Sequence, residues 1–371
     1  MKMENLDGKT VEMALPSTKI MDLPPEILVF ILKNVSSVED MISCLKTCTT
    51  WKNLIMRMFR DKGKFLVVSW HGYEIVDLLN PSTNYSLLAK NFPKVSGATG
   101  GLLQKSPIIC GGWHRYDGWC LDLLSKNCGV IGKPEMEMKM IEKRNAAASV
   151  VLNQTNIWII GGMNRFSPLS STEFIKIGQP SIKGPDLPFT ICNHSMIQYD
   201  EKSIYIIGGD QNNSSFGYGS SNTWIANPTN GFQITRGPCL NEKRKGHGCA
   251  KMTINGRTIL VVAGGYKPMD SVEILDPSTN NKWIPGPKLP LKLRRLAAMV
   301  TSPTGKGVIV MGGLMENHGT RSNAMFELSD SMEWTTLKQT LKKGHGFTFS
   351  NLAIPLPDEL VREKENKNQI E

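Results

Sequence analysis

Five apolar stretches of this sequence each end on a pair of glycines. The pairs are Gly111-Gly112, Gly161-Gly162, Gly208-Gly209, Gly264-Gly265 and Gly312-Gly313. They recur at nearly even steps, and a period of about 50 residues is typical of a repeat array or a propeller. Glycine tolerates a positive φ and the close approach of another backbone. We therefore expect each pair to end a strand at a crowded axis, rather than to form five unrelated turns.

Each repeat carries the same parts in the same order. A strand rich in small residues, such as 144–151 or 245–252, precedes the apolar strand, and a third strand such as 271–276 follows the glycines. A turn then leads to an aromatic residue, as at Trp283, Trp334 or Phe232. Four short strands separated by turns predict one antiparallel sheet per repeat. Because one such sheet cannot bury both of its faces, neighbouring sheets are expected to stack around an axis.

The order of strand, Gly-Gly, third strand and spaced Trp resembles the kelch repeat, from about Phe65 to Pro357. The resemblance implies a mainly β fold, a kelch-type β-propeller over residues 63–357. Five repeats carry the glycine pair. A sixth, degenerate repeat at Lys64–Leu88 has Ser69-Trp70 in its place, so we predict six blades.

The degenerate repeat lacks its own first strand, and the C-terminal segment can supply it. The stretch Lys343–Asn351 matches Lys245–Met252 in sequence. We expect it to pair with the first blade and close the ring, which removes the exposed sheet edges that invite aggregation.

Residues 20–62 have a helical pattern instead. Pro24 and Pro25 stand where a helix begins, which is a tolerated place for proline. Ile27, Leu28 and Ile31 follow at helical spacing and form an apolar face. The charged or polar segments 1–19 and 358–371 are expected to be disordered.

The pattern L-P-x-E-I-L followed by a Trp resembles the F-box. That family implies docking on the Skp-type adaptor of a cullin–RING ubiquitin ligase. The residues expected to contact the adaptor are Leu23, Pro24, Ile27, Leu28, Ile31 and Trp51. The alternative interpretation is a helical cap that packs on the propeller.

Cations recur just before the first strand of most repeats. They are Lys94, Arg144, Arg244, Lys245, Arg294, Arg295 and Lys343. Equivalent positions in a propeller form a ring around one mouth of its channel, and such a ring selects an acidic ligand. The formal net charge of +10 agrees with this expectation, and some kelch adaptors hold acidic peptides with arginines near this strand start. The alternative is that these cations are solvated turn residues.

The longest repeat step adds the polar stretch Asp210–Asn222 after its glycine pair. Ser, Gly, Asn and Tyr are common in adaptable binding loops, so Phe216 and Tyr218 are candidate target contacts. The stretch can equally be a tolerated insertion.

No catalytic or metal-binding pattern stands out. The eight cysteines include no C-x-x-C pair, and His194, His247 and His345 are interpreted as residues of the repeat pattern. Neither a P-loop nor a Gly-x-Ser-x-Gly motif occurs. We expect no cofactor, no metal and no enzyme activity, and no aromatic–basic motif supports nucleic-acid binding.

The N-terminus is acidic without a long apolar core, and no run of about 18 apolar residues occurs. The sequence thus predicts no membrane partner and a location in the cytoplasm or nucleus. The leading hypothesis is the substrate-recognition subunit of an SCF-type ubiquitin ligase, which binds a target protein through an acidic segment. The alternative is a cytoskeletal or regulatory propeller scaffold without a role in ubiquitylation.

Overall fold

The structure is a computed structural model of the 371-residue chain. It describes residues 2–4, 10–12, 63–69, 72–79, 85–87, 97–104, 106–112, 120–122, 140–164, 167–177, 179–211, 219–279, 281–296, 298–316, 320–341 and 352–356. The chain divides into two compact units, Met1–Arg60 and Asp61–Glu371. In the first unit β1 (Lys2–Glu4) pairs with β2 (Thr10–Glu12). Among the described residues, no helix has the length and apolar character needed to cross a membrane.

The second unit consists of antiparallel sheets, which we name after their innermost strands. The β9 blade contains β9 (Ala148–Leu152), β10 (Asn156–Ile160), β11 (Thr172–Ile175) and β12 (Ile182–Lys183). The β14 blade contains β14 (Ser195–Gln198), β15 (Ile204–Ile207), β17 (Thr223–Asn227) and β18 (Gln233–Arg236). The β19 blade contains β19 (Gly248–Ile254), β20 (Arg257–Ala263), β21 (Val272–Leu275) and β22 (Ile284–Pro285).

The remaining sheets complete the unit. The β24 blade contains β23 (Leu293–Arg294), β24 (Ala298–Thr301), β25 (Val308–Met315), β26 (Arg321–Leu328) and β27 (Trp334–Thr336). The β28 blade contains β28 (Ala353–Pro355), β3 (Lys64–Ser69), β4 (Gly72–Asp77) and β5 (Tyr85–Leu87). The β6 sheet contains β6 (Thr99–Leu103), β7 (Ser106–Cys110) and β8 (Cys120–Asp122), and β13 (Ile191–Cys192) pairs with β16 (Asp210–Gln211).

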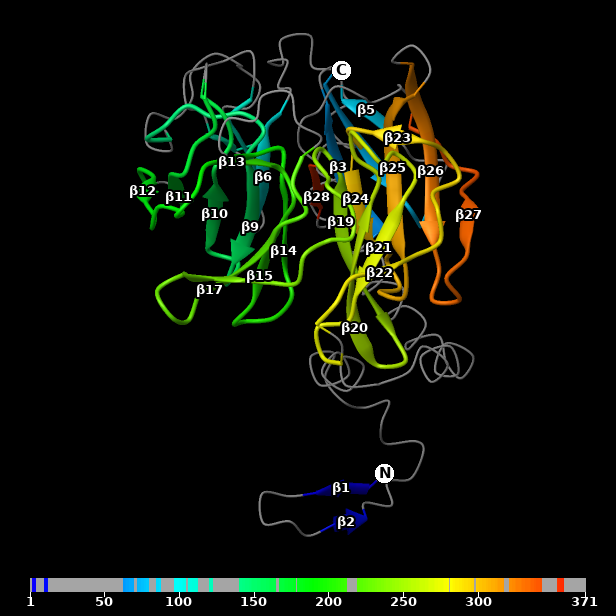
Figure 1. The fold of residues 1–371 in the computed structure, drawn as a ribbon. Helices are drawn as coiled ribbons and strands as arrows, with labels where there is room; N and C mark the ends of the chain where they lie inside the picture. Colours follow the sequence, from blue (N-terminus) through cyan, green and yellow to red (C-terminus); the bar gives the residue numbers. More distant parts are fainter. Residues whose placement is uncertain are drawn as a thin grey trace, which may run out of the picture. The chain divides into compact units, whose positions relative to one another are not determined.

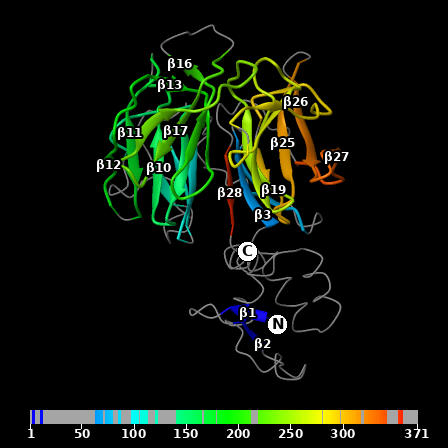
Figure 2. The ribbon, with the colours of Figure 1, turned by 60° about the horizontal axis from the view of Figure 1, so that its bottom comes forward.

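The sheets surround one axis. Their innermost strands contact one another in the order β6, β9, β14, β19, β24 and β28, and β28 contacts β6 again. Figure 1 shows the sheets standing around these strands, and in Figure 2 the outer strands β10–β12 and β25–β27 lie on opposite sides of β19 and β28. This arrangement is a β-propeller, as the repeat pattern predicts.

The expectation of six blades is not met among the described residues. Five blades have four or more strands, whereas the β6 sheet has three. Residues 123–139, which follow β8, lie outside the described part of the chain.

The two ends of the propeller sequence meet in the β28 blade. β28 pairs antiparallel with β3, with Ile354 opposite Leu66 (Figure 1). The segment expected to do this, Lys343–Asn351, lies outside the described residues, and β28 begins after its end. The ring is thus joined by a C-terminal strand that stands further along the chain than the sequence match places it.

The reason is the register of the repeat. Leu341 and Leu240 occupy equivalent places, since Leu341 donates its backbone N–H to the Asn323 carbonyl and Leu240 donates to the Ser221 carbonyl. Counted along the sequence from these leucines, Lys343 comes earlier in its repeat than Lys245 does in its own. The match of residue types is therefore out of register with the repeat.

The hydrophobic core lies between neighbouring blades. One cluster joins the β9 and β14 blades through residues such as Trp158 and Ile206, and another joins the β14 and β19 blades through Tyr205 and Val262. The aromatic residue that ends a repeat contributes to these joints. The indole Nε1 of Trp283 donates to the Pro238 carbonyl at 3.0 Å, and the indole Nε1 of Trp334 donates to the Pro287 carbonyl at 2.8 Å.

Candidate target-binding site on the propeller

The glycine pairs join each blade to the next. The first glycine has a positive φ, and at Gly161 and Gly208 an added Cβ would lie 2.4 and 2.7 Å from the carbonyl oxygens of Ile191 and Arg244. The second glycine of each pair donates its N–H to that same carbonyl oxygen, at 2.8 Å in both cases. The close approach expected at a crowded axis is therefore confirmed, and it explains why a side chain is excluded there.

Arg144 and Arg244 do not line the mouth of the channel as the cation-ring hypothesis requires. Their exposed fractions are only 4% and 0%. Arg144 Nη2 contacts Glu173 Oε1 at 2.6 Å, and Arg244 Nη2 contacts Glu273 Oε1 at 2.9 Å. Each guanidinium also donates to the carbonyl of the first glycine in its own blade, Gly161 or Gly264. These two arginines therefore tie the entry loop of a blade to its second and third strands.

The same place holds an apolar pair in two other blades. In the β14 blade Ile191 and Trp224 replace the arginine and glutamate, and in the β24 blade Leu293 and Phe326 do so; each pair lies within one hydrophobic cluster. The carboxylates of Glu173 and Glu273 also accept the backbone N–H groups of Ile141 and Asn241.

Proline stands at the corresponding positions of the apolar blades, Pro188 and Pro290. Because proline has no N–H to satisfy, the loss of the carboxylate there leaves no backbone donor unpaired at that position. Three positions in a repeat thus change together, and the charged and apolar sets are alternative solutions to one packing problem.

The other described cations of the predicted ring gather around one tyrosine. Lys245 Nζ lies 5.3 Å and Arg294 Cζ 5.6 Å from the centroid of the Tyr266 ring. Both are within range for cation–π attraction. Lys245 pairs with Asp210 at 3.0 Å. Arg295 belongs to the same group: burial and the nearby Arg294 lower the pKa of its guanidinium, and the nearby Tyr266 opposes this effect. We call Lys245, Tyr266, Arg294 and Arg295 the basic platform.

Arg295 is held in an unusual backbone conformation. Its φ is +50°, and the equivalent residues of other blades, among them Gly97, Asn193 and Gly246, also have positive φ. Glycine and asparagine adopt this region at little cost, whereas for other residues it costs about 1–2 kcal/mol. Ala146, at the equivalent place of the β9 blade, has a φ of +53°. The positive φ therefore belongs to the repeat as a whole.

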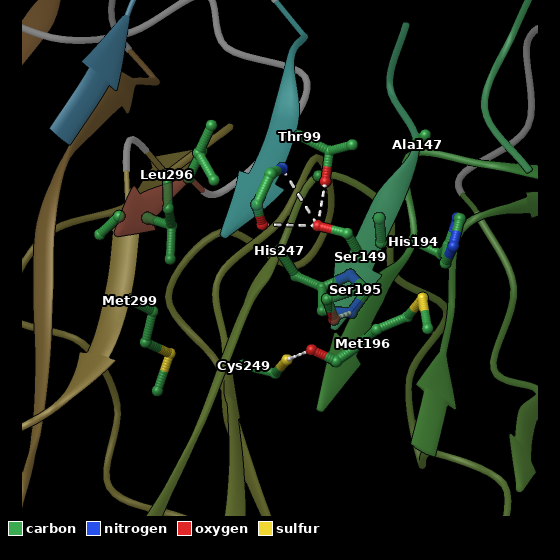
Figure 3. Close-up of a pocket in the computed structure, with 15 residues that line it drawn as sticks. Thr99, Ala147, Ser149, His194, Ser195, Met196, His247, Cys249, Leu296 and Met299 are labelled. Atoms are coloured by element: carbon green, nitrogen blue, oxygen red, sulfur yellow. Dashed lines mark hydrogen bonds between the residues drawn. The ribbon is translucent and has the colours of Figure 1, made fainter. Parts of the chain in front are cut away.

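Figure 3 shows a cavity of about 130 Å³ lined by the innermost strands. Ser195 Oγ lies 2.6 Å from His247 Nε2, and Thr99 Oγ1 lies 2.6 Å from Ser149 Oγ. Burial lowers the pKa of both His194 and His247 to about 3; for His247 the nearby Arg244 and His194 add to this effect. A histidine with so low a pKa is uncharged near neutral pH and is a poor general base there.

The other histidine, His345, lies outside the described residues. Within the described part of the chain, no group of three His, Cys, Asp or Glu side chains is placed to hold a metal ion. The predicted adaptor contacts also fall outside it: Leu23, Pro24, Ile27, Leu28, Ile31 and Trp51. The same is true of four candidate target contacts, Lys94, Lys343, Phe216 and Tyr218.

Sequence reasoning missed the acidic partners and the tyrosine. Glu173 and Glu273 follow their arginines at the same spacing and stand in the same Ser-x-Glu pattern, at Ser171 and Ser271. That constant spacing is a signal for an internal ion pair that the sequence does contain. No comparable signal marks Tyr266, because only the fold brings it beside Arg294.

The comparisons with known proteins address the two units separately. The F-box-like family model matches residues 20–59, so these residues form an F-box-like domain. No curated protein sequence matches the chain. Among solved structures, the one titled "Structure of YjhT" matches with a TM-score of 0.54 and 16% sequence identity, covering 68% of this chain and 86% of that chain. At this identity the likeness concerns the fold alone, a β-propeller.

Proposed function

We propose that this protein is the substrate-recognition subunit of an SCF-type cullin–RING ubiquitin ligase. The observation that carries the proposal is the F-box-like match at residues 20–59 in a chain whose second unit is a β-propeller. In this proposal the F-box docks on a Skp-type adaptor bound to a cullin, and the propeller binds the target protein. Such a subunit works in the cytoplasm or nucleus, where the ligase operates.

We further propose that the propeller is of the kelch type with six blades, the β6 sheet being the incomplete one. The closed order of contacts from β6 through β28 and back to β6 supports this count. The glycine pairs at blade joints and the tryptophans that contact the preceding blade support the kelch assignment.

The target-binding site in this proposal is the basic platform, which takes an acidic segment of the target. Of the cations in the predicted ring, Lys245, Arg294 and Arg295 keep the proposed role in target binding. Arg144 and Arg244 are buried, and we give them a structural role within their blades instead. Lys94, Lys343, Phe216 and Tyr218 remain candidate contacts. The protein itself performs no chemistry: it raises the local concentration of target lysines near the ubiquitin carrier.

A pull-down tests the adaptor half of the proposal. The full chain should capture the Skp-type adaptor and cullin, and the Leu23→Ala/Pro24→Ala double variant should lose them because the predicted apolar contacts are removed. The matched control is Ile182→Ala, which removes an apolar side chain that is 52% exposed on the propeller. Failure of the wild-type chain to capture the adaptor would refute the ligase assignment and favour a propeller scaffold outside ubiquitylation.

A further inference from the structure

Two cysteines occupy opposite register positions in the β6 sheet. Cys110 is the last residue of β7 and Cys120 is the first residue of β8, and the antiparallel register places them directly opposite each other. Cys110 is 1% exposed, and its thiol is free. The fold therefore brings two thiol-bearing residues to one point of the sheet.

The other blades show which kind of register position the two cysteines occupy. Cys110 precedes the first glycine of its pair, as Ile160 does in the β9 blade, where Ile160 stands opposite Thr172. The next residue there is Gly161, whose N–H donates to the Ser171 carbonyl at 3.1 Å. The same bond recurs in two further blades, from Gly208 to the Asn222 carbonyl and from Gly264 to the Ser271 carbonyl.

These bonds determine the character of the neighbouring pair. Hydrogen-bonded and non-hydrogen-bonded pairs alternate along antiparallel strands. Because Gly161 and Ser171 form a hydrogen-bonded pair, Ile160 and Thr172 form a non-hydrogen-bonded one. By equivalence of the repeats, the pair of cysteines is non-hydrogen-bonded as well.

A non-hydrogen-bonded pair is suited to a disulfide. Its Cα atoms lie about 4.5 Å apart, closer than those of a hydrogen-bonded pair. Disulfides join residues whose Cα atoms are about 4.4–6.8 Å apart. The register of β7 and β8 therefore allows a disulfide between Cys110 and Cys120.

Packing at this position does not by itself require cysteine. The equivalent pairs of four other blades contain no thiol: they are Ile160–Thr172, Ile207–Thr223, Ala263–Val272 and Met311–Met325. Several combinations of residues thus fill the same place in the repeat. The presence of cysteine at both positions in one sheet points to the chemistry of the thiol.

We propose that Cys110 and Cys120 form a redox modification site, at which a peroxide converts the two thiols into a disulfide between β7 and β8. One thiol takes an oxygen atom from hydrogen peroxide and becomes a sulfenic acid, with release of one water molecule. The second thiol attacks the sulfenic sulfur, so that the S–S bond forms and a second water molecule leaves. A small dithiol reverses the reaction by exchange. The site is independent of adaptor docking and of target binding.

Peptide mapping after mild oxidation tests the proposal. The folded full chain is treated with hydrogen peroxide, the remaining thiols are blocked with N-ethylmaleimide, and the chain is digested without reduction. Trypsin cleaves after Arg115 and Lys126. It therefore releases three different peptides, which contain Cys110, Cys120 and Cys128. The first two should be found joined, with a mass about 2 Da below their sum, and dithiothreitol should separate them.

Oxidation of the chain in urea provides the comparison. Fewer residues separate Cys120 from Cys128 than from Cys110, and a shorter loop closes at a lower cost in entropy. The unfolded chain should therefore also give the Cys120–Cys128 disulfide, and the folded chain should lose that product. The same mixture of products in both conditions would show that proximity along the chain selects the partner, and would overturn the proposal.

Two variants complete the test. Cys120→Ser should abolish the linked product, whereas Cys239→Ser, which removes an exposed cysteine, should leave it unchanged. In the wild type Cys239 also reports the dose of oxidant, because its thiol is exposed. Recovery of Cys110 with a free thiol at a dose that oxidises Cys239 would refute the inference, and so would a disulfide from Cys110 to any cysteine other than Cys120.

Discussion

Replacing Glu273 by alanine should destabilise the propeller far more than replacing an exposed glutamate by alanine would. Glu273 is 2% exposed and accepts hydrogen bonds from Arg244 Nε at 3.1 Å and Arg244 Nη2 at 2.9 Å. It also accepts the backbone N–H and the side-chain amide of Asn241, at 2.6 and 2.7 Å. The variant therefore leaves the buried Arg244 without the carboxylate it pairs with, and it removes the acceptor of the backbone N–H groups of Asn241 and Glu242.

The expected loss follows from what Arg244 retains. Breaking a buried ion pair by removing one partner costs about 3–5 kcal/mol. Arg244 still donates to the Gly264 and Ser271 carbonyls at 2.9 and 3.0 Å, so part of its hydrogen bonding survives. We therefore expect the lower end of that range, a decrease of about 3 kcal/mol in the free energy of unfolding. Urea denaturation at pH 7, followed by tryptophan fluorescence, measures it.

A triple variant should restore the stability that Glu273→Ala loses. The β24 blade has Pro290, Leu293 and Phe326 at the places of Asn241, Arg244 and Glu273, so the triple variant Asn241→Pro/Arg244→Leu/Glu273→Phe copies a solution that the fold already uses. Replacing a whole buried ion pair by well-packed apolar residues is often neutral, and the triple variant should regain most of the lost stability. A loss below about 1 kcal/mol in Glu273→Ala, close to that of an ordinary surface substitution, would refute the argument. A triple variant no more stable than the single one would refute the equivalence of the two sets.

Three further perturbations have defined outcomes. Gly161→Ala should cost about 3 kcal/mol or more, because its φ is +55° and the new Cβ would lie 2.4 Å from a carbonyl oxygen of the next blade. Stability should fall as the pH drops from about 6.5 toward about 3, because the unfolded chain binds protons at His194 and His247 that the folded chain does not. The contribution is complete above about pH 6.5, and the His194→Gln/His247→Gln variant should flatten the dependence between pH 7 and 5. Truncation after residue 350 removes β28, in which Ile354 is fully buried, and should lower the melting temperature because it exposes the edge of β3.

Each of these outcomes has a matched control. Gly231 has a φ of +57° and nothing within 4 Å of an added Cβ, so Gly231→Ala should show only the backbone strain of about 1–2 kcal/mol; equal losses at Gly231 and Gly161 would contradict the contact argument. Parallel pH dependences of the wild type and the double histidine variant would contradict the second prediction. For the third, truncation after residue 357 retains β28, and the two truncated chains should not melt at the same temperature.

The repeated architecture could be predicted from sequence because its signals are local. The alternation of apolar strands and turns can be recognised without knowing which distant residues pack against them. Gly161 and Gly208 likewise indicate that another backbone segment approaches closely, even when that segment is not known. The strand that completes the first blade was harder to place. Lys343 matches Lys245 only in residue type. The true register of the last repeat is given by Leu341, whose backbone N–H donates to the Asn323 carbonyl, and this hydrogen bond cannot be read from the sequence.

The fate of the charged side chains could not be predicted in this way. Arg144 and Arg295 both precede the first strand of a repeat, and by residue type alone either could face solvent. Arg144 turns inward because Glu173 lies opposite on the third strand of the same blade, whereas Arg295 joins Tyr266 and Arg294 on the basic platform.

The sequence by itself therefore determined the β-propeller repeat and the F-box-like pattern at residues 20–59, because strand periodicity, glycine pairs and short motifs are written in neighbouring residues. Only the tertiary structure decided which cations are buried in ion pairs within a blade and which form the basic platform. Whether a charge is buried in an ion pair or offered to a ligand depends on groups that lie close in space but far apart in the chain, and that proximity exists only once the blades have packed.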